Sequence, residues 1–332
     1  GNLFLKNNNS SEAINCFLKA TKIKKNDPKI IFKLGLAYKN NLKYEASISE
    51  LKLAIKLDPY FSDAYSALGT VYIEINKYED AISCFKKAID LDPNFSAAYH
   101  NLLFAYSYIE NFSNFEYRNY LKKYRNILNT YQLDCVKYNY VKKPKKIKIG
   151  FVSGDFNNHP VGYFLFDLIK KINKSNFETY AYSNKYTIND NINLQFKINF
   201  NYWREIFDKS DLETINQIRN DGINILIDLS GHTNNNRLSI FANKPAPIQL
   251  TWIGCNMSTG VDEIDYIIGD NYSFKDSQKK NFVEKFWHMP TVLQCLSIHN
   301  LNLIYKDIPS KKNGFITFGS FNNITKLNDE VI

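Results

Sequence analysis

The sequence predicts two parts, an array of helical repeats over residues 1–130 and a doubly wound α/β domain that follows a linker at residues 131–146. Three observations support this division. The first third of the chain repeats every 34 residues, the rest alternates short apolar strands with amphipathic helices, and small polar residues gather where those strands end. A chain of 332 residues is long enough for two domains that each bury a core.

The composition favours a folded protein that does not span a membrane. Hydrophobic residues make up 44% and aromatic residues 15% of the chain, which is too apolar for a disordered chain, and no apolar run is long enough to span a bilayer. The first residues lack the pattern of a secretory signal. The five cysteines show no CxxC or Cys/His ligand spacing, so we expect a reduced, cytoplasmic location and no structural zinc.

The formal charge of +9 raises the question of an anionic partner. The basic residues are nearly all lysines scattered among asparagines, and the densest run, residues 142–146, lies in the predicted linker. A solvated hinge is therefore favoured over a nucleic-acid patch. We predict neither a nucleic acid nor a membrane as partner.

The repeat is visible in several columns of residues. Gly1, Gly35 and Gly69 are 34 residues apart, the same spacing relates a series of isoleucines and alanines, and Asp-Pro pairs punctuate the chain. Small residues at fixed positions indicate two helices that approach closely within each unit. Such a unit cannot bury its apolar face alone, so neighbouring units stack into a superhelix.

This period, with LG near Tyr and a closing Pro, resembles the tetratricopeptide repeat over residues 1–97. The resemblance places Gly1 within a first helix, so we expect further repeats before it. Residues 97–130 are interpreted as a diverged capping helix pair. Repeats of this kind usually bind peptides on a concave surface, which predicts protein or peptide acceptors as partners. A spacer or a homodimer surface stays open as an alternative.

The stretch KKIKIGFVSGDFNNHPVGYFLF, residues 145–166, predicts a buried strand, a turn and a helix. His159 precedes Pro160, which suits the first turn of a helix. Parallel sheets bind ligands at the carboxyl ends of their strands, and helix N-termini attract anions. We therefore predict that His159 is a catalytic residue beside a phosphate site. A helix-capping or core histidine is the alternative.

Further strands are expected at residues 177–183, 203–207, 223–229 and 249–254, with a helix at residues 212–220. Several of these strands end in turns rich in Gly, Ser, Thr and His. Such turns expose backbone N–H groups and hydroxyls, which a sugar-nucleotide site requires. His232, in the turn SGHT, is a candidate donor contact, and an imidazole that bonds the backbone of a structural turn is equally open.

Four motifs follow one another along the chain: SGDFNNHPVGYFL, DGINILIDLSGHT, the STG loop before DYII, and GFITFGSFNN. Together they resemble the protein O-GlcNAc transferase and SPINDLY family, glycosyltransferase family 41. The resemblance covers residues 97–332. It implies a GT-B fold of two Rossmann-like lobes, the first at residues 147–312 and a second that begins at residues 313–332 and is largely missing. It also implies an inverting transfer of a sugar from a nucleotide diphosphate to Ser or Thr of proteins.

The resemblance also implies roles for single residues. His159 matches a histidine proposed as a base or as a donor-site contact, and which group is the base stays open. Asn323 and Lys326 match residues that contact the phosphates of the nucleotide, where a fixed cation stabilises the departing diphosphate. Ser258, Thr259 and Gly260 match a loop near the donor sugar. Cys255 and Asn256 depart from the family pattern in that loop. No metal and no cofactor is expected.

Three functions are carried forward. The first is a protein O-GlcNAc transferase that uses UDP-GlcNAc, with repeats that recruit protein substrates. The second is a SPINDLY-like O-fucosyltransferase that uses GDP-fucose, and the third is a repeat scaffold without catalysis. Because most of the second lobe would lie beyond Ile332, we expect a fragment that is a poor catalyst alone.

Other chemistry is disfavoured. Ser153, Asp155 and His159 do not form a hydrolase triad, because the GxSxG pattern is absent. Asp262 and Asp265 are interpreted as a solvated turn rather than a metal site, because no third ligand has suitable spacing. The remaining histidines are interpreted as structural: His100, His288 and His299.

Overall fold

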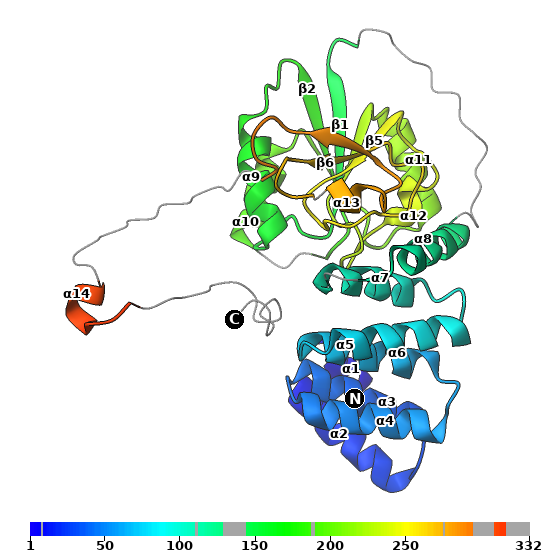
Figure 1. The fold of residues 1–332 in the computed structure, drawn as a ribbon. Coiled ribbons are helices and arrows are strands. Elements are labelled where there is room, and N and C mark those ends of the chain that lie inside the picture. The colour runs from blue at the N-terminus through cyan, green and yellow to red at the C-terminus, as the bar shows by residue number, and fades with distance from the viewer. Residues whose placement is uncertain are drawn as a thin grey trace.

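A computed structural model describes residues 1–7, 9–109, 112–128, 144–186, 190–274, 276–294 and 309–316. Figure 1 shows a stack of helices with an α/β domain at one end. The helices of the stack are α1 (Asn2–Lys6), α2 (Ser10–Ile23), α3 (Pro28–Asn40), α4 (Tyr44–Leu57), α5 (Ser62–Glu74), α6 (Tyr78–Leu91), α7 (Ser96–Ala105), a 3₁₀ turn (Tyr106–Tyr108) and α8 (Asn114–Leu128).

The 34-residue period corresponds to pairs of antiparallel helices, as predicted. Each repeated glycine lies where two helices touch. A Cβ added to Gly35 would lie 2.8 Å from Leu51 Cγ, and one added to Gly69 would lie 2.6 Å from the ring of Phe85. Both distances are shorter than van der Waals contact, so a side chain at these positions would push α3 from α4 and α5 from α6.

The Asp-Pro pairs play two different roles, which explains why Asp27 and Asp58 are 31 residues apart whereas Asp58 and Asp92 are 34 apart. Asp27 caps the N-terminus of α3 by accepting from the N–H groups of Lys29 and Ile30, and its proline begins the helix. Asp58 and Asp92 instead follow the C-termini of α4 and α6 and accept from backbone N–H groups two residues later. The same dipeptide therefore starts one helix and separates two later pairs.

The α/β domain contains one seven-stranded sheet in the order β3-β2-β1-β4-β5-β6-β7, and every pairing is parallel. The order reverses between β1 and β4, which is the point where doubly wound sheets bind ligands. The strands are β1 (Ile147–Ser153), β2 (Phe177–Ser183), β3 (Tyr202–Glu205), β4 (Ile225–Asp228), β5 (Ile248–Thr251), β6 (Tyr266–Gly269) and β7 (Lys285–His288).

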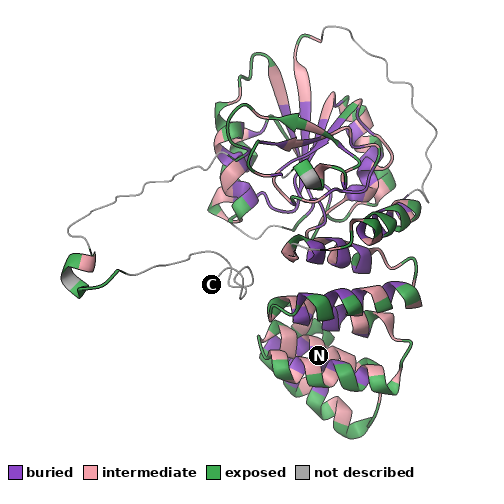
Figure 2. Cartoon of the chain, viewed as in Figure 1, coloured by how far each residue is buried: buried purple, intermediate pink, exposed green. Residues whose placement is uncertain are grey.

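Alternating residues of each strand enter two different cores, because successive side chains point to opposite faces of a sheet. Phe151 of β1 joins a core with α9 (Pro160–Lys171) and α10 (Asn191–Asn199), whereas Val152 joins a core with α11 (Asp211–Asp221) and α12 (Leu238–Phe241). Figure 2 shows the resulting buried centre of the sheet. The short helices α13 (Asp276–Lys279) and α14 (Pro309–Asn313) complete the described elements.

The second of these cores continues into the helical stack without a break. One cluster of buried side chains contains Phe85 and Leu102 of the repeats, Leu121 of α8, and Ile215 and Phe241 of the α/β domain. The capping helices α7 and α8 therefore belong to both parts and fix how the repeats sit on the sheet. Among the described helices, none combines the length and the apolarity needed to cross a bilayer.

Several elements of the α/β domain were not predicted, among them α10 and β7. Helix α10 has no clean apolar stripe, and β7 is an edge strand in which three of the four residues are exposed and Phe286 is partly buried. The predicted linker lies outside the described residues from 131 to 143, and so does the expected opening of a second lobe from residue 317 onward.

Candidate functional site

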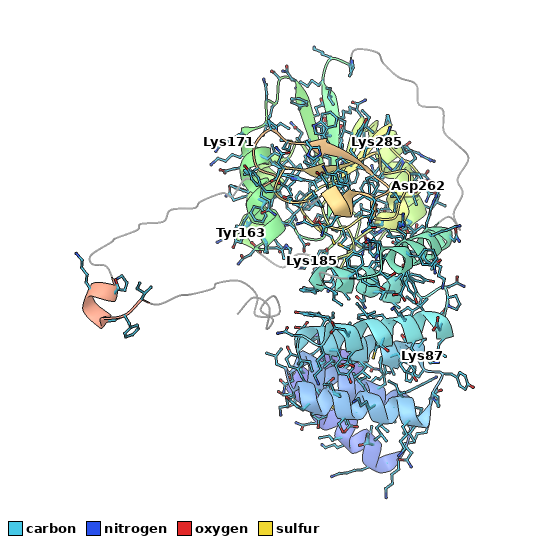
Figure 3. All side chains as sticks on the ribbon, in the orientation of Figure 1. Lys87, Tyr163, Lys171, Lys185, Asp262 and Lys285 are labelled. Atoms are coloured by element: carbon cyan, nitrogen blue, oxygen red, sulfur yellow. The ribbon has the colours of Figure 1, made fainter. Side chains whose placement is uncertain are left out.

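The carboxyl ends of the strands meet at the edge of the sheet that faces the helical stack. The register pairs Ser153 with Ser183, Val152 with Asp228, and Asp228 with Thr251. Figure 3 labels Lys185, two residues beyond β2, between the sheet and α7. The polar strand ends therefore face the repeats.

A cavity of about 380 Å³ lies between this edge and the repeats. Its wall on the sheet side includes Asp155 and His159 after β1 and His232 after β4. Its wall on the other side includes side chains from three helices of the stack: Lys39, Glu74, Asn101 and Phe104. The structure thus brings two of the predicted site residues, His159 and His232, to one cleft, and we call it the His159 cleft.

His159 is the N-cap of α9 and keeps part of its ring in the cleft. The N–H of Val161 donates to Nδ1 of His159 at 3.3 Å, and the side chain is 43% exposed. Within the described residues, Nε2 has no hydrogen-bond partner. His159 therefore caps the helix through Nδ1 and also lines the cleft, so both interpretations of this residue apply.

The cap determines which nitrogen carries the proton. Because Nδ1 accepts from Val161, the neutral ring carries its hydrogen on Nε2. The opposite tautomer would need an acceptor for Nδ1–H, and the nearest one, Oδ2 of Asp155, is 3.7 Å away. In this geometry His159 therefore offers an N–H group to the cleft rather than a lone pair.

The first turn of α9 has few backbone N–H groups that could bind an anion. Pro160 has no N–H, Val161 donates to His159, and Tyr163 donates to the carbonyl of His159. Only the N–H of Gly162 is left among these groups to bind an anion. A Cβ at Gly162 would lie 2.3 Å from the carbonyl oxygen of Asn157, so the preceding loop packs tightly against this turn. The phosphate site predicted at this helix end therefore has at most one backbone donor.

Asp155 is the carboxylate nearest His159. Its side chain is 11% exposed, and burial raises its pKa while His159 and Lys185 lower it. Its own backbone N–H donates to the hydroxyl of Ser153 at 2.9 Å, so that hydroxyl serves the turn. This arrangement agrees with the rejection of a hydrolase triad.

Asp228 builds the turn that carries His232. The carboxylate is fully buried and accepts from the N–H groups of Ser230 and Gly231, at 3.1 and 2.8 Å, and from the hydroxyl of Thr251 at 2.8 Å. Desolvation raises its pKa, and these hydrogen bonds oppose the increase. The turn after β4 is therefore held by one carboxylate that also ties it to β5.

His232 is 3% exposed, and both ring nitrogens are engaged. Nε2 lies 3.0 Å from the carbonyl oxygen of Ser258, and Nδ1 lies 3.1 Å from Nδ1 of His100 on α7. Burial lowers the pKa of His232 to about 4. These contacts are those of a structural imidazole, while the ring still forms part of the wall of the His159 cleft.

The STG loop lies behind that wall. Ser258 and Thr259 are buried, and their hydroxyls donate to the buried carboxylate of Glu284, as does the N–H of Thr259 at 2.7 Å. Gly260, with φ of 72°, packs against Leu121 of α8, where an added Cβ would lie 2.8 Å from Leu121 Cδ2. These residues line no part of the His159 cleft, so contact with a donor sugar stays a prediction.

The remaining candidates have simpler outcomes. Asp262 pairs with Arg125 of α8, and Asp265 pairs with Lys244 at 2.6 Å, so both carboxylates have cationic partners. His288 is exposed at the end of β7. The other predicted residues, His299, Asn323 and Lys326, lie outside the described residues.

Sequence reasoning missed the contribution of the repeats to the site. Lys39, Glu74 and Asn101 reach the cleft, and no local motif marks them. His100 was interpreted as structural without a partner, although it contacts His232. The only available signal for Asp228 and Glu284 was an acidic residue within or beside an apolar strand, which implies a buried hydrogen-bonded carboxylate.

Comparison with known proteins gives a consistent result. The family described as Glycosyl transferase family 41 matches residues 121–308, more than half of the chain. Tetratricopeptide repeat families match residues 1–41, 28–61 and 62–95.

Curated relatives match the α/β part. A protein of Oryza sativa named "Probable UDP-N-acetylglucosamine--peptide N-acetylglucosaminyltransferase SPINDLY" is 35% identical over 192 residues, 57% of this chain and 21% of the relative. The SPINDLY protein of Petunia hybrida is 33% identical over 192 residues, 57% of this chain and 20% of that protein. A UDP-N-acetylglucosamine-peptide N-acetylglucosaminyltransferase of Caenorhabditis elegans is 33% identical over 154 residues, 45% of this chain and 13% of that protein. This chain thus spans about a fifth of the first relatives' length.

A solved structure extends the match to the repeats. A point variant of the Thermobaculum terrenum O-GlcNAc transferase superposes with a TM-score of 0.82 at 25% identity, covering 97% of this chain and 61% of that one. The helical repeats, the parallel sheet and the family match agree, and the chain belongs to glycosyl transferase family 41.

Proposed function

We propose that this chain provides the acceptor-binding repeats and the first lobe of a protein O-glycosyltransferase. The observation that carries the proposal is the His159 cleft, which has one wall from the repeats and one from the strand ends. A peptide that lies along the repeats would reach the sheet edge that carries His159 and His232. The nucleotide sugar would approach from the other side of the same cleft.

The repeat wall suits a polypeptide. The amide of Asn101 can both donate to and accept from an extended backbone, and Lys39 and Glu74 offer charges of opposite sign. Phe104 adds an apolar surface beside them. Such a mixed wall would suit a peptide backbone while imposing modest demands on its side chains.

The reaction we propose is an inverting displacement. The acceptor hydroxyl attacks the anomeric carbon from the face opposite the diphosphate, and its proton passes to a base. The bond between the anomeric carbon and the diphosphate oxygen breaks, so the nucleoside diphosphate departs with an added negative charge. His159 would donate a hydrogen bond from Nε2 to the donor, because its Nδ1 is held by Val161. General-base catalysis would then come from another group. Lys326 and Asn323 are proposed, from the family resemblance alone, to contact the diphosphate.

The donor we favour is UDP-GlcNAc, since the relatives named above are named for that donor. GDP-fucose is the alternative donor. The proposed partners are protein acceptors. A homodimer and a cytoplasmic location stay predictions.

Calorimetry of the full-length gene product with UDP-GlcNAc and with GDP-fucose tests the proposal, followed by transfer to a Ser/Thr peptide. We expect binding of UDP-GlcNAc and a peptide mass increased by one N-acetylhexosamine. Binding of GDP-fucose alone would assign the SPINDLY-like alternative. Binding of neither nucleotide would leave the repeat scaffold as the function.

A further inference from the structure

Three aromatic rings meet where the repeats touch the turn after β4. His100 of α7 lies between Tyr124 of α8 and His232, with ring centroids 4.9 Å and 5.4 Å away. The hydroxyl of Tyr124 and Nε2 of His100 are 3.3 Å apart, and the two Nδ1 atoms of the histidines are 3.1 Å apart. The contact joins residues separated by 132 positions in the chain.

The hydrogen bonds of this cluster have only one consistent direction. The carbonyl oxygen of Ser258 can only accept, so Nε2 of His232 must carry a hydrogen. The neutral His232 ring then has a lone pair on Nδ1, and Nδ1–H of His100 must donate to it. Nε2 of His100 is left as an acceptor for the hydroxyls of Tyr124 and of Ser96, each 3.3 Å away.

Both rings are held neutral by their surroundings. Burial lowers the pKa of His100 to about 3 and that of His232 to about 4. The chain of hydrogen bonds therefore runs from Tyr124 through His100 and His232 to Ser258 near neutral pH. The same carbonyl of Ser258 also accepts from the hydroxyl of Tyr117 on α8, at 3.4 Å.

We propose that His100 is a positioning residue of the transfer site, which acts from the repeats by fixing the orientation of the His232 ring. The inference rests on the proposed function, because it takes the His159 cleft as the transfer site. His232, Thr233 and Asn234 form one wall of that cleft. Asn101, the next residue along α7, lines the opposite, acceptor-facing wall. One turn of α7 thus contacts His232 in one wall of the cleft and contributes Asn101 to the other.

Two nearly isosteric substitutions separate this role from simple packing. His100→Asn can place an amide N–H where Nδ1–H was, whereas His100→Leu fills a similar volume without a donor. If His100 only packs, the two variants should behave alike. If it positions His232, His100→Leu should lower kcat for peptide glycosylation by about tenfold to a hundredfold, as expected for a displaced site group. His100→Asn should restore kcat to within a few-fold of the native value.

The kinetic measurement uses the full-length gene product, with circular dichroism to verify that both variants are folded. We expect the KM for the peptide to change little, since the acceptor wall keeps Asn101. Equal kcat values for the folded Asn and Leu variants would overturn the proposal. So would a loss expressed entirely in KM.

A second measurement does not depend on catalysis. The chain has five histidines, so ¹⁵N spectra of its imidazoles can be assigned with single variants. We expect His232 with hydrogen on Nε2, His100 with hydrogen on Nδ1, and a scalar coupling between their Nδ1 atoms. Hydrogen on Nε2 of His100 would overturn the proposal. If the native enzyme transfers no sugar but these tautomers are observed, the proposed function fails while the hydrogen-bond direction stands.

Discussion

His159 and His232 follow neighbouring strands and line the same cleft, but their rings have opposite surroundings. The side chain of His159 is 43% exposed, and one nitrogen is bonded to the backbone of its own helix. His232 is 3% exposed, and each nitrogen faces a partner from a different part of the chain. The first ring can meet a ligand, whereas the second holds the wall against which a ligand would lie.

The difference originates in the two turns. After β1, the loop leads into a helix whose cap uses only Nδ1 of the histidine. After β4, the carboxylate of Asp228 folds the turn back, so that His232 points into the contact with α7 and α8. The same residue type at one sheet edge is thus either partly exposed in the cleft or buried in a contact, according to which groups form the hydrogen bonds of its turn.

The largest expected effect is that of Asp228→Ala on stability. The change leaves two buried N–H groups and one hydroxyl without their acceptor, each worth about 1–3 kcal/mol, so we expect the free energy of unfolding to fall by at least about 3 kcal/mol. Urea unfolding measures it. Asp155→Ala is the matched control at the neighbouring strand end. It should cost far less, since within the described residues the Asp155 carboxylate accepts no hydrogen bond from its turn and lies 3.7 Å from Nδ1 of His159. Equal losses would contradict the assignment of Asp228 as the organiser of the turn.

A smaller stability effect and a large activity effect are expected at His159. Asn is a good N-cap and Ala a poor one, so His159→Asn should keep the stability of α9, while His159→Ala should lose about 1 kcal/mol. Both should lower glycosylation by about a hundredfold or more if the ring is essential. Thermal unfolding and peptide transfer by the full-length product measure the two effects.

His159→Gln distinguishes the two roles of the ring in the same assay. Glutamine can present an amide N–H near the position of Nε2 but cannot take a proton. Activity well above that of His159→Ala would support the hydrogen-bond donor role. Activity as low as that of the alanine variant would return His159 to the role of base.

The fold was predictable where the signal is local or repeated. The period of 34 residues gave the helix pairs, because each repeated glycine marks a close contact such as that of Gly69 with Phe85. Strand β4 was predicted because it lies in a nearly continuous apolar run, as expected of a strand covered on both faces, and β1 was predicted from apolar residues that alternate with Lys148 and Gly150. The edge strand β7 and helix α10 carry weaker patterns and were missed.

The site was predictable only in part, because half of it depends on how two regions dock. His159 has a local signature in its strand, turn and proline. The contact of His100 with His232 spans 132 residues, and it follows from the packing of α7 and α8 on the sheet. The contribution of Lys39 and Asn101 to the cleft has the same origin. No property of their neighbouring residues could indicate it.

The acid dependence of stability should report the buried pair. The pKa values of His100 and His232 are lowered in the folded state, from 6.5 to about 3 and about 4. The unfolded chain therefore binds more protons below about pH 6.5, and stability falls with acidification until the folded pKa is reached. Each histidine contributes at most about 1.4 kcal/mol per pH unit.

His232→Gln tests this dependence. The glutamine amide can still donate to Ser258 but does not titrate, so the variant should lose stability less steeply than the native chain between pH 6 and pH 5. The buried carboxylates Asp228 and Glu284 have raised pKa values and titrate in both proteins, so the difference between the two slopes isolates the imidazole. Urea unfolding at several pH values measures it, and parallel slopes would contradict a neutral buried ring.

The smallest effect is expected for the ion pair of Asp262 with Arg125, which bridges the loop after β5 and α8. Figure 3 shows Asp262 on the side of the α/β domain next to α8. The side chains are 40% and 38% exposed, and exposed pairs of this kind contribute about 0–1 kcal/mol. Asp262→Asn should therefore lower the free energy of unfolding by less than about 1 kcal/mol, and less still at high salt, because ions screen exposed charges.

The same variant tests the metal alternative for Asp262 and Asp265. If they held Ca²⁺ or Mg²⁺, either ion would raise the Tm of the native chain by mass action, and Asp262→Asn would abolish the increase. We expect no such increase, because both carboxylates already have cationic partners in Arg125 and Lys244. A Tm that either ion raises in the native chain but not in the Asp262→Asn variant would contradict the interpretation of these carboxylates as a solvated turn.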